Sequence, residues 1–521
     1  MSDVDVVVIG SGFGGAVTAC RLAEAGYNVL VLERGRRWDP TTFPRKADDP
    51  WVFDPDHPQQ RNGWFDLRIF RNMTVAQGAG VGGGSLVYAN VSIPAKRDTF
   101  RSGWPPEVTF DELAAPYARV GAMLNVKRLP ERQWTARTKL IKEAAGKVGA
   151  ADRFEPLELA VSFDEDWTYD VPDPHAPARS KTFTNAQGRQ QGTCVHLGNC
   201  DIGCEVNARN TLDLNYLAAA EQRGAEIRPL HLVTGIAPEA GGYRVGYNRI
   251  EPGRLVPGSV TSRLVVVAAG SLGSTELLLR CRDQQATLPG ISAQLGIGWS
   301  SNGDFLTPAI HPFRRIDPSR GPTITAAINF LEQGADGQDV FIQDGGFPDL
   351  LQGFLQRAAG TPVTDARVRA LVESVRPLLA GNQLTSHVMP WFAQARDAAD
   401  GRLLLRRGRL DLDWDITRSE ATIEAVVRMH QRLAQATGGM PLTPLTWIVG
   451  RDLITPHPLG GCNMATTAAG GVVDHKGEVF GCRNLFVADG AIVPKAIGLN
   501  PSRTIAALAE RIAALIVADG R

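Results

Sequence analysis

Two side chains near the C-terminal end of the chain could act on one reacting group. His457 opens a His-Pro-Leu-Gly-Gly-Cys segment, and Asn500 stands directly before Pro501. A neutral imidazole accepts a proton or a hydrogen bond near neutral pH, and an amide can orient an oxygen or donate to it. We expect these two side chains, together with the start of the helix that follows Asn500, to converge on one pocket.

Each of these residues also has a plainer interpretation. His457 could be a core histidine beneath the Pro-Leu-Gly-Gly turn. Asn500 is a favoured N-cap residue and Pro501 suits the first helical position, so the sequence predicts a helix that begins here and ends near Asp519. Its apolar positions follow helical spacing at Ile505, Leu508, Ala509, Ile512, Leu515 and Ile516. The start of this helix would carry a partial positive charge, which favours an anionic group nearby.

A dinucleotide site is predicted at the opposite end of the chain. Residues 5–9 are an apolar run typical of a buried strand, and residues 16–25 favour a helix. Residues 28–32 read as a second strand, and Glu33 stands at its end. Gly10-Ser11-Gly12-Phe13-Gly14-Gly15 joins the first strand to the helix, which is the context that the G-x-G-x-x-G pattern requires.

The glycines of this loop have distinct expected roles. Gly10 permits the tight turn, Gly12 lets the backbone approach a pyrophosphate, and Gly15 allows the helix to pack closely on the strand. The free N–H groups at the helix start bind an anion, and Glu33 can accept hydrogen bonds from both ribose hydroxyls. This segment alone leaves FAD and NAD open.

Further glycine-rich segments are expected to meet the same ligand. Gly82-Gly83-Gly84-Ser85 belongs to a loop too long for a hairpin turn, and it is either backbone lying along a cofactor or a surface loop. A buried strand over residues 264–269 ends at Gly270, as in a Rossmann-type sheet that returns to its ligand. Another strand is expected near 227–233, where Val233 would pack on an adenine or serve as ordinary core.

Composition narrows the class of protein. The 521 residues, 43% of them hydrophobic, suffice for a large core, and Lys+Arg and Asp+Glu both total 55. This charge balance gives no reason to expect a nucleic acid or a polyanionic surface as partner. No apolar run reaches membrane-spanning length and no leader is recognised, so a cytoplasmic protein is expected, with peripheral lipid contact left open.

Cysteine usage favours a reducing compartment and no metal. The seven cysteines are sparse and odd in number, unlike a disulfide scaffold. Cys194, Cys200 and Cys204, with His196 as a fourth ligand, would make a metal site, but their spacing matches neither the usual zinc pairs nor an iron–sulfur run. Thiols beside a turn are the favoured interpretation.

Taken in order, these motifs resemble the glucose–methanol–choline (GMC) family of FAD oxidoreductases, and most of all its cholesterol oxidase branch. The motifs are residues 10–15 with Glu33, 80–87, 270–274, 457–462, and Asp489-Gly490 through Asn500-Pro501. The resemblance implies non-covalent FAD and oxidation of an alcohol by hydride transfer to flavin N5, with O2 or another electron acceptor. It assigns His457 and Asn500 as the catalytic pair. The expected cofactor-binding residues are Gly10, Gly12, Phe13, Gly14, Gly15, Glu33, Gly82, Gly83, Gly84, Ser85, Asn90, Val233, Gly270, Asp489, Gly490, Asn500 and Pro501.

One departure from the cholesterol oxidase pattern concerns the substrate. Those oxidases carry a Glu base that isomerises the steroid double bond, and Gln343 stands in its place here. Gln cannot abstract a proton, and Asp344 would point to the opposite side of an extended segment. Isomerase activity is therefore not expected. A bulky apolar alcohol, sterol-like or secondary, is the expected substrate; the alternatives are a polyol or sugar dehydrogenase, and a non-catalytic flavin-binding electron carrier.

The expected fold is α/β: a Rossmann-like FAD-binding domain interleaved with a substrate domain of antiparallel sheet and helices. The FAD domain is assigned residues 1–105, 191–306 and 445–521. The substrate domain is assigned 106–190 and 307–444, with residues 350–379 as candidate helical lid material.

Overall fold

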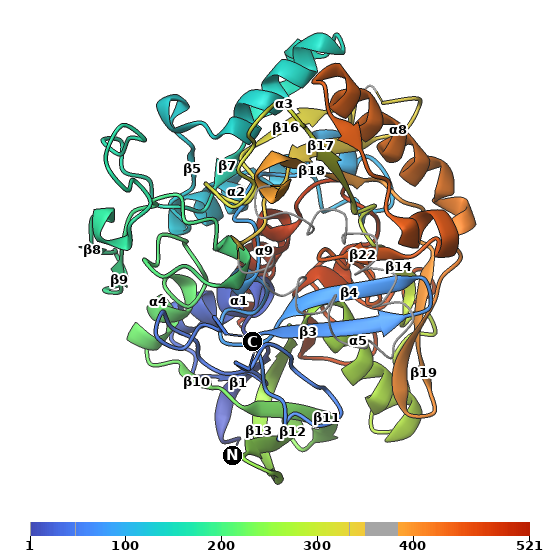
Figure 1. Ribbon diagram of the computed structural model, residues 1–521. Coiled ribbons are helices and arrows are strands. Elements are labelled where there is room, and N and C mark those ends of the chain that lie inside the picture. The colour runs from blue at the N-terminus through green and yellow to red at the C-terminus, as the bar shows by residue number, and fades with distance from the viewer. Residues whose placement is uncertain (1, 47, 333, 350–383, 521) are drawn as a thin grey trace.

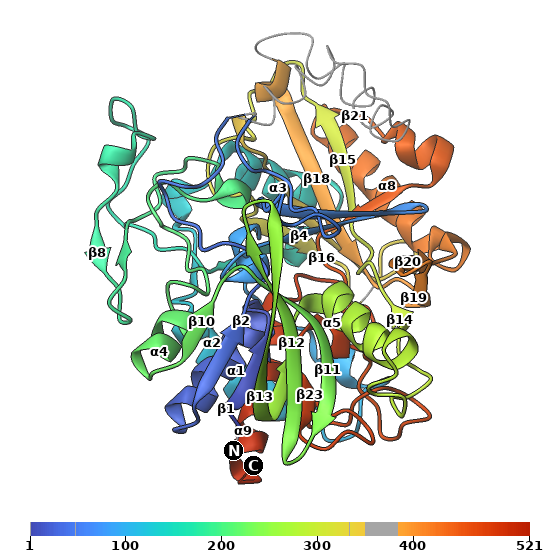
Figure 2. The same ribbon diagram turned by 90° about the horizontal axis from the view of Figure 1, so that it is seen from below.

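The computed structural model describes residues 2–46, 48–332, 334–349 and 384–520. Its core is built on two sheets that lie at opposite ends of the molecule, with the β3–β4 hairpin between them (Figures 1 and 2). The lid expected over residues 350–379 lies outside the described residues.

The first sheet has the parallel core that the N-terminal motif predicts. Its strands run in the order β10-β2-β1-β13-β12-β11, and β23 also pairs with β13. β1, β2, β10, β13 and β23 run parallel to one another, whereas β12 pairs antiparallel with β13, and β11 with β12. The strands are β1 (Val4–Ile9), β2 (Val29–Leu32), β10 (Glu226–Arg228), β11 (His231–Glu239), β12 (Gly242–Glu251), β13 (Arg254–Val267) and β23 (Leu485–Val487).

Apolar β-branched residues explain why β1 lies at the centre of this sheet. Val6, Val7 and Val8 are fully buried, as expected for a strand covered on both faces. Helices α1 (Phe13–Glu24) and α5 (Gly270–Leu279) pack against strands of this sheet, and α4 (Tyr216–Gln222) and α9 (Ser502–Ala518) pack on α1. α9 lies against α1 and also against α2 (Phe110–Met123).

The segment near 227–233 forms two strands where the sequence predicted one. β10 ends at Arg228 and β11 begins at His231. Pro229 has no N–H to donate to a ladder, and Leu230 has φ = 59°, a left-handed conformation that breaks an extended strand. Pairing with β2 therefore stops at Arg228. From His231 the chain forms β11, which pairs antiparallel with β12.

The second sheet is antiparallel, as the sequence predicted, in the order β21-β15-β18-β17-β16-β6. Its strands are β6 (Phe154–Pro156), β15 (Phe305–Ile310), β16 (Ala326–Asn329), β17 (Val340–Asp344), β18 (Val388–Ala395) and β21 (Met440–Pro441). Helices α3 (Ala136–Lys147) and α8 (Glu420–Ala436) pack on one face, where Ile342 and Trp391 are fully buried in one apolar cluster. The other face turns toward the first sheet.

Smaller ladders complete the described fold. They are β3 (Phe65–Phe70) with β4 (Met73–Gly78) and β22 (Leu453–Thr455); β14 (Ile297–Trp299) with β19 (Gly401–Arg406) and β20 (Arg409–Asp413); β5 (Lys127–Arg128) with β7 (Glu158–Leu159); and β8 (Phe183–Thr184) with β9 (Gln190–Gln191).

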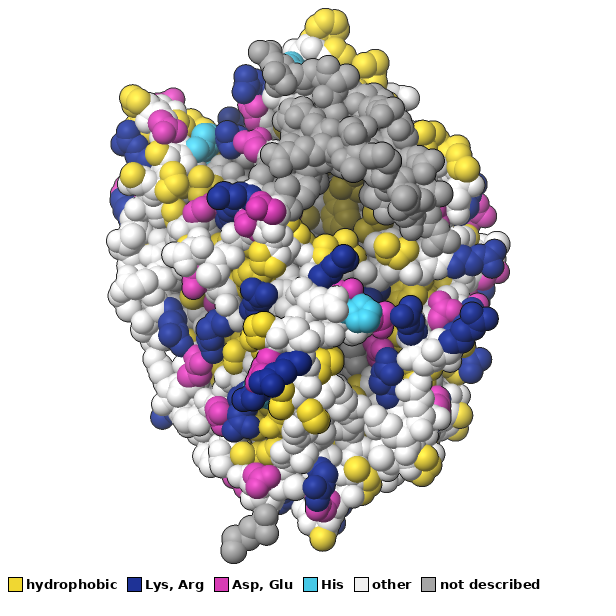
Figure 3. Space-filling model, turned by 60° about the horizontal axis from the view of Figure 1, so that its bottom comes forward, with side chains coloured by type: hydrophobic (Ala, Val, Ile, Leu, Met, Phe, Trp, Pro, Cys, Tyr) yellow, Lys and Arg dark blue, Asp and Glu magenta, His cyan; other side chains and the backbone are white. Residues whose placement is uncertain are grey.

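The surface carries both signs of charge. In the face shown in Figure 3, basic and acidic side chains are intermixed, and hydrophobic side chains are visible within a hollow. None of the described helices is both long and apolar enough to cross a membrane.

Candidate active site

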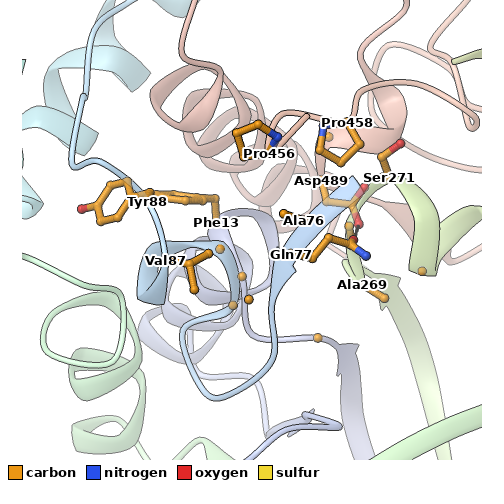
Figure 4. A pocket seen from close by; sticks show the side chains of 18 of the residues that line it. Phe13, Ala76, Gln77, Val87, Tyr88, Ala269, Ser271, Pro456, Pro458 and Asp489 are labelled. Atoms are coloured by element: carbon orange, nitrogen blue, oxygen red, sulfur yellow. Dashed lines mark hydrogen bonds between the residues drawn. The ribbon is translucent and has the colours of Figure 1, made fainter. Parts of the chain in front are cut away.

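A cavity of about 700 Å³ lies between the two sheets. The first sheet contributes the Gly10–Gly14 turn and the segment from Ala268 to Gly273, and the second contributes Leu306, Gly345 and Phe392. In Figure 4, Phe13 and Tyr88 lie together on one side of this cavity, and Pro456 and Pro458 lie near Asp489. Both ends of the chain and its middle thus meet at a single site.

The glycines show whether a dinucleotide fits here. A Cβ added at Gly14 would lie 1.9 Å from the carbonyl oxygen of Ala488, and one at Gly15 would lie 2.0 Å from that of Gly10, so close packing within the protein requires both. Gly12 is different: its φ of −72° suits any residue, and the nearest atom to an added Cβ is the Cα of Gly83 at 3.9 Å. Neither backbone conformation nor packing requires glycine at 12. The remaining reason is a ligand that lies against the backbone, as a pyrophosphate does.

Glu33 lies at the expected end of β2. Its Oε2 accepts from the hydroxyl of Ser11 at 2.7 Å, and its Oε1 accepts from the backbone N–H of Gly35 at 2.8 Å. These bonds fix the carboxylate on the cavity wall, where its remaining lone pairs can accept from ribose hydroxyls. The residues present therefore fit the adenosine and pyrophosphate part of FAD.

Asp489 lines the cavity and contacts the turn that follows β13. One carboxylate oxygen accepts from the backbone N–H of Gly270 at 2.7 Å and from the hydroxyl of Ser274 at 2.5 Å, and the other accepts from the N–H of Ala491 at 2.8 Å. Burial raises the pKa of Asp489, and these hydrogen bonds counteract that effect. The carboxylate joins β13 to the segment after β23.

Most of the predicted cofactor residues line this cavity. They are Gly10, Gly12, Phe13, Gly14, Glu33, Gly83, Gly84, Val233, Gly270, Asp489, Gly490, Asn500 and Pro501. Gly15, Gly82, Ser85 and Asn90 lie outside the lining and have structural partners. The Asn90 side chain accepts from Arg209 at 2.9 Å, and the Ser85 hydroxyl donates to the carbonyl of Gly82 at 2.7 Å.

His457 is held by a carboxylate that the sequence did not reveal. Its Nδ1 lies 2.9 and 3.0 Å from the two oxygens of Asp304, which is buried at the start of β15. Nδ1–H therefore donates to the carboxylate, and the Nε2 lone pair is left as an acceptor at the cavity. Burial raises the pKa of Asp304, and the imidazole counteracts this. The Thr455 hydroxyl also lies 2.5 Å from Asp304.

Asn500 does not cap α9, and that prediction was wrong. The helix begins at Ser502 with Pro501 as its N-cap, and no side chain caps it. Instead, the Oδ1 of Asn500 accepts from the Nε2 of Gln343 at 2.6 Å. With the carbonyl oxygen engaged, the NH2 of Asn500 is the group available to a ligand oxygen.

Gln343 has neighbours that face the same cavity. Along the second sheet, Leu306 is directly opposite Phe392, and Phe392 is directly opposite Gln343. Paired residues share one face of a sheet, so these side chains form a row toward the reaction pair. The Phe392 ring lies 6.2 Å from that of His457, measured between centroids. As predicted, Asp344 points the other way, where it pairs with Arg137 at 2.9 Å in the interior.

The cysteine-rich segment is occupied by structural contacts. The ring of His196 stacks on Trp167 at 4.0 Å, and its Nδ1 lies 3.0 Å from the Tyr169 hydroxyl. Burial lowers the pKa of His196 to about 3 and raises that of Cys194. No group of three or more metal-binding side chains is found within the described part of the chain.

The fold and the cavity define a dinucleotide-binding protein, and comparison with known proteins gives its family. Residues 397–509 match the GMC oxidoreductase family, and residues 8–48 match an NAD(P)-binding Rossmann-like domain. A cholesterol oxidase from Acinetobacter baumannii is 30% identical, with 99% of this chain and 95% of that protein covered. A cholesterol oxidase from Mycobacterium tuberculosis is 31% identical, with 98% and 91% covered. The solved structure of pyridoxine 4-oxidase from Mesorbium loti has a TM-score of 0.64 at 17% identity and covers 99% of both chains.

The chain belongs to the GMC oxidoreductase family. It is an FAD-dependent enzyme that acts on alcohol-type donors.

Proposed function

We propose that the enzyme oxidises a bulky apolar alcohol, sterol-like or secondary, and that His457 and Asn500 hold the reacting hydroxyl. The observation that carries this proposal is the paired support of the two side chains. Asp304 fixes the imidazole with its acceptor nitrogen toward the cavity, and Gln343 fixes the amide with its donor available. One side chain accepts from the hydroxyl and the other donates to its oxygen.

The proton and the oxygen have separate partners in this arrangement. His457 Nε2 takes the hydroxyl proton, and the buried Asp304 carboxylate stabilises the imidazolium that results. Asn500 donates to the oxygen as it becomes a carbonyl oxygen. FAD, when bound, supplies the acceptor for the hydride that leaves the carbon. Gly12, Gly84, Glu33 and Gly270 are the residues proposed to hold it.

The apolar lining supports a bulky apolar substrate. Leu306, Ile324 and Phe392 line the cavity on the side of the second sheet, where burial of apolar surface contributes about 25 cal/mol per Å². The two relatives described above are named as cholesterol oxidases. At position 343 this chain has an amide, which cannot act as a base, so we propose oxidation without movement of a steroid double bond.

The two sheets also support the proposed interleaving of domains. Residues 1–105, 191–306 and 445–521 would form the FAD domain, and 106–190 with 307–444 the substrate domain. β6 and β16–β18 lie within the latter ranges. Helix α2, at 110–123, packs on α9 and so joins the FAD domain by contact.

An alcohol panel scored by anaerobic bleaching of the yellow enzyme tests the proposal. Sterol-like and other bulky secondary alcohols should bleach the flavin, and sugars or polyols should not. Preferential bleaching by polyols, or by none of the panel, would contradict it. Air should restore the yellow colour rapidly, since we propose O2 as the acceptor; recovery only with a dye or quinone would indicate a dehydrogenase.

A further inference from the structure

Asp201 differs from the other carboxylates on the cavity wall. Among the described residues, four acidic side chains line this cavity. Glu33 and Asp489 are held by the hydrogen bonds given above, and Glu276 is paired with Arg280 at 2.6 Å and with Arg68 at 3.3 Å. Among the described residues, the Asp201 carboxylate accepts hydrogen bonds from the Thr323 hydroxyl, at 3.4 and 3.5 Å.

The neighbouring cations do not neutralise Asp201 by direct contact. Arg209 donates to Asn90 and to the carbonyls of Ser85 and Leu86. Arg137 donates to Asp344 and to surrounding carbonyls, among them that of Thr323. Burial raises the pKa of Asp201 to about 6, and these two arginines counteract that effect from a distance. With the Thr323 hydroxyl as its described donor, the carboxylate has acceptor capacity left over.

The turn that carries Asp201 is rigidly placed. The indole N–H of Trp64 donates to the carbonyl of Asp201 at 3.1 Å, and Arg45 donates to the carbonyl of Ile202 at 2.8 Å. A carboxylate fixed in this way does not need to move in order to accept a hydrogen bond from a ligand, which favours binding.

Asp201 and the reaction pair line the same cavity, so one elongated substrate can contact both. Its partner Thr323 precedes Ala327 by four residues, so their Cα atoms are at most about 14 Å apart. Ala327 is directly opposite Gln343, which bonds to Asn500. Apolar wall residues such as Ile324 lie in the same cavity.

We propose that Asp201 is a specificity residue that accepts a hydrogen bond from a second donor group of the substrate, a hydroxyl or an ammonium, remote from the alcohol that is oxidised. A buried carboxylate whose described hydrogen-bond partner is one hydroxyl at 3.4–3.5 Å is incompletely satisfied, and a donor on the ligand removes the cost of that burial. This inference rests on the proposed function, because it assumes that the same cavity binds the alcohol.

Binding of unreactive ligands to the FAD-loaded enzyme tests this inference apart from turnover. The probes are two steroid 3-ketones that are identical except for a hydroxyl at carbon 17, titrated by calorimetry. The wild type should bind the hydroxylated ketone at least about 10-fold more tightly, as a hydrogen bond to a charged group permits. Asp201→Leu should abolish this preference and bind the plain ketone as well as the wild type or better. Asp201→Asn should keep a smaller preference.

Asp213→Asn is the matched control. Asp213 is another acid whose pKa burial raises, but it lines a separate small cavity of about 60 Å³. This variant should keep the wild-type preference. Equal binding of the two ketones by the wild type, or an unchanged preference in Asp201→Leu, would overturn the proposal. Loss of FAD from Asp201→Asn would also overturn it, because Asp201 would then serve the cofactor. Failure of the proposed function would show separately, as an absence of bleaching by any alcohol in the wild type.

Discussion

The two sides of the cavity are built by different means. On the cofactor side, the wall is mostly backbone, and the sequence requirement is the absence of side chains at Gly12 and Gly84. On the reaction side, the wall is made of side chains that hold one another across long separations. His457 and Asp304 are 153 residues apart, and Gln343 and Asn500 are 157 apart. A backbone wall is encoded within a short local motif, whereas a side-chain wall depends on the whole fold.

The largest effect is expected where a side chain is added to the backbone wall. Gly12→Ala should fold normally and lose FAD, because the new Cβ occupies space that only the ligand uses. Gly14→Ala should instead destabilise the protein itself, by about 1–3 kcal/mol or more, because its Cβ overlaps the carbonyl of Ala488. Two measurements distinguish these variants: the amount of flavin bound per chain reports loss of FAD, and the melting temperature of the FAD-free protein reports destabilisation. A Gly12→Ala variant that retains FAD with wild-type affinity would contradict the account.

On the reaction side, Asp304→Asn should have the strongest effect on rate. An amide at 304 can donate to Nδ1 of His457, which would leave the proton on Nε2 and remove the acceptor from the cavity. The rate of anaerobic flavin reduction should fall about 100-fold or more, with FAD content unchanged. Thr455→Val is the comparison variant: it removes a hydroxyl that donates to Asp304 and accepts from the backbone N–H of His457, but it leaves the imidazole paired with Asp304. Equal rates in Asp304→Asn and wild type would rule out the positioning role.

Gln343 should have a smaller effect. Gln343→Ala frees the amide of Asn500 to turn, and we expect flavin reduction to slow about 10-fold, the size of one hydrogen bond. Gln343→Glu can only accept, so Asn500 must turn its NH2 toward position 343 and away from the substrate. With a steroid substrate, the wild-type product should keep its double bond in place. A shifted double bond in the wild-type product would show that another group acts as the base.

The smallest effect on catalysis is expected at Glu510, which ties α9 to the helices of the first sheet. Its carboxylate accepts from Arg21 at 2.8 Å, Arg119 at 3.0 Å and Tyr216 at 2.7 Å. Despite burial, which raises it, these partners hold the pKa of Glu510 below its unfolded value of 4.5. Its stabilising contribution is therefore present above about pH 4.5 and is lost as the pH falls through the folded pKa.

Glu510→Gln should lower the free energy of unfolding by about 1–2 kcal/mol at pH 7. The difference from wild type should shrink below pH 4.5, and the rate of flavin reduction should be unchanged. Chemical denaturation at a series of pH values measures this. If the stability difference between wild type and Glu510→Gln grew as the pH fell, the predicted loss of the Glu510 contribution in acid would be wrong.

The local motifs made much of the fold predictable. The first βαβ unit and the helix after Pro501 both follow from residue patterns within a few turns of chain. The misassigned cap at Asn500 shows the limit of that approach. Asn followed by Pro is a good local cap, but the Gln343 amide competes for its oxygen, and nothing in the local sequence signals a partner so far away.

Asp304 was missed for the same reason. It lies between Gly303 and a strand of the second sheet, with no motif around it, and its role appears only when β15 approaches the segment before His457. Asp201 has no local signal either, because what distinguishes it is a single long-range donor among the described residues, Thr323, in a cavity formed by both sheets. The break after Arg228 was visible as Pro229, although its left-handed neighbour Leu230 was not.

Anaerobic stopped-flow reduction of the flavin, in wild type and in His457→Ala matched for FAD content, tests the central claim most directly. With a bulky apolar alcohol, the wild type should bleach in a single fast phase, and the variant should be slower by about 100-fold or more. If His457→Ala keeps its FAD and is reduced as fast as the wild type, His457 does not take the proton and the proposed reaction centre is wrong.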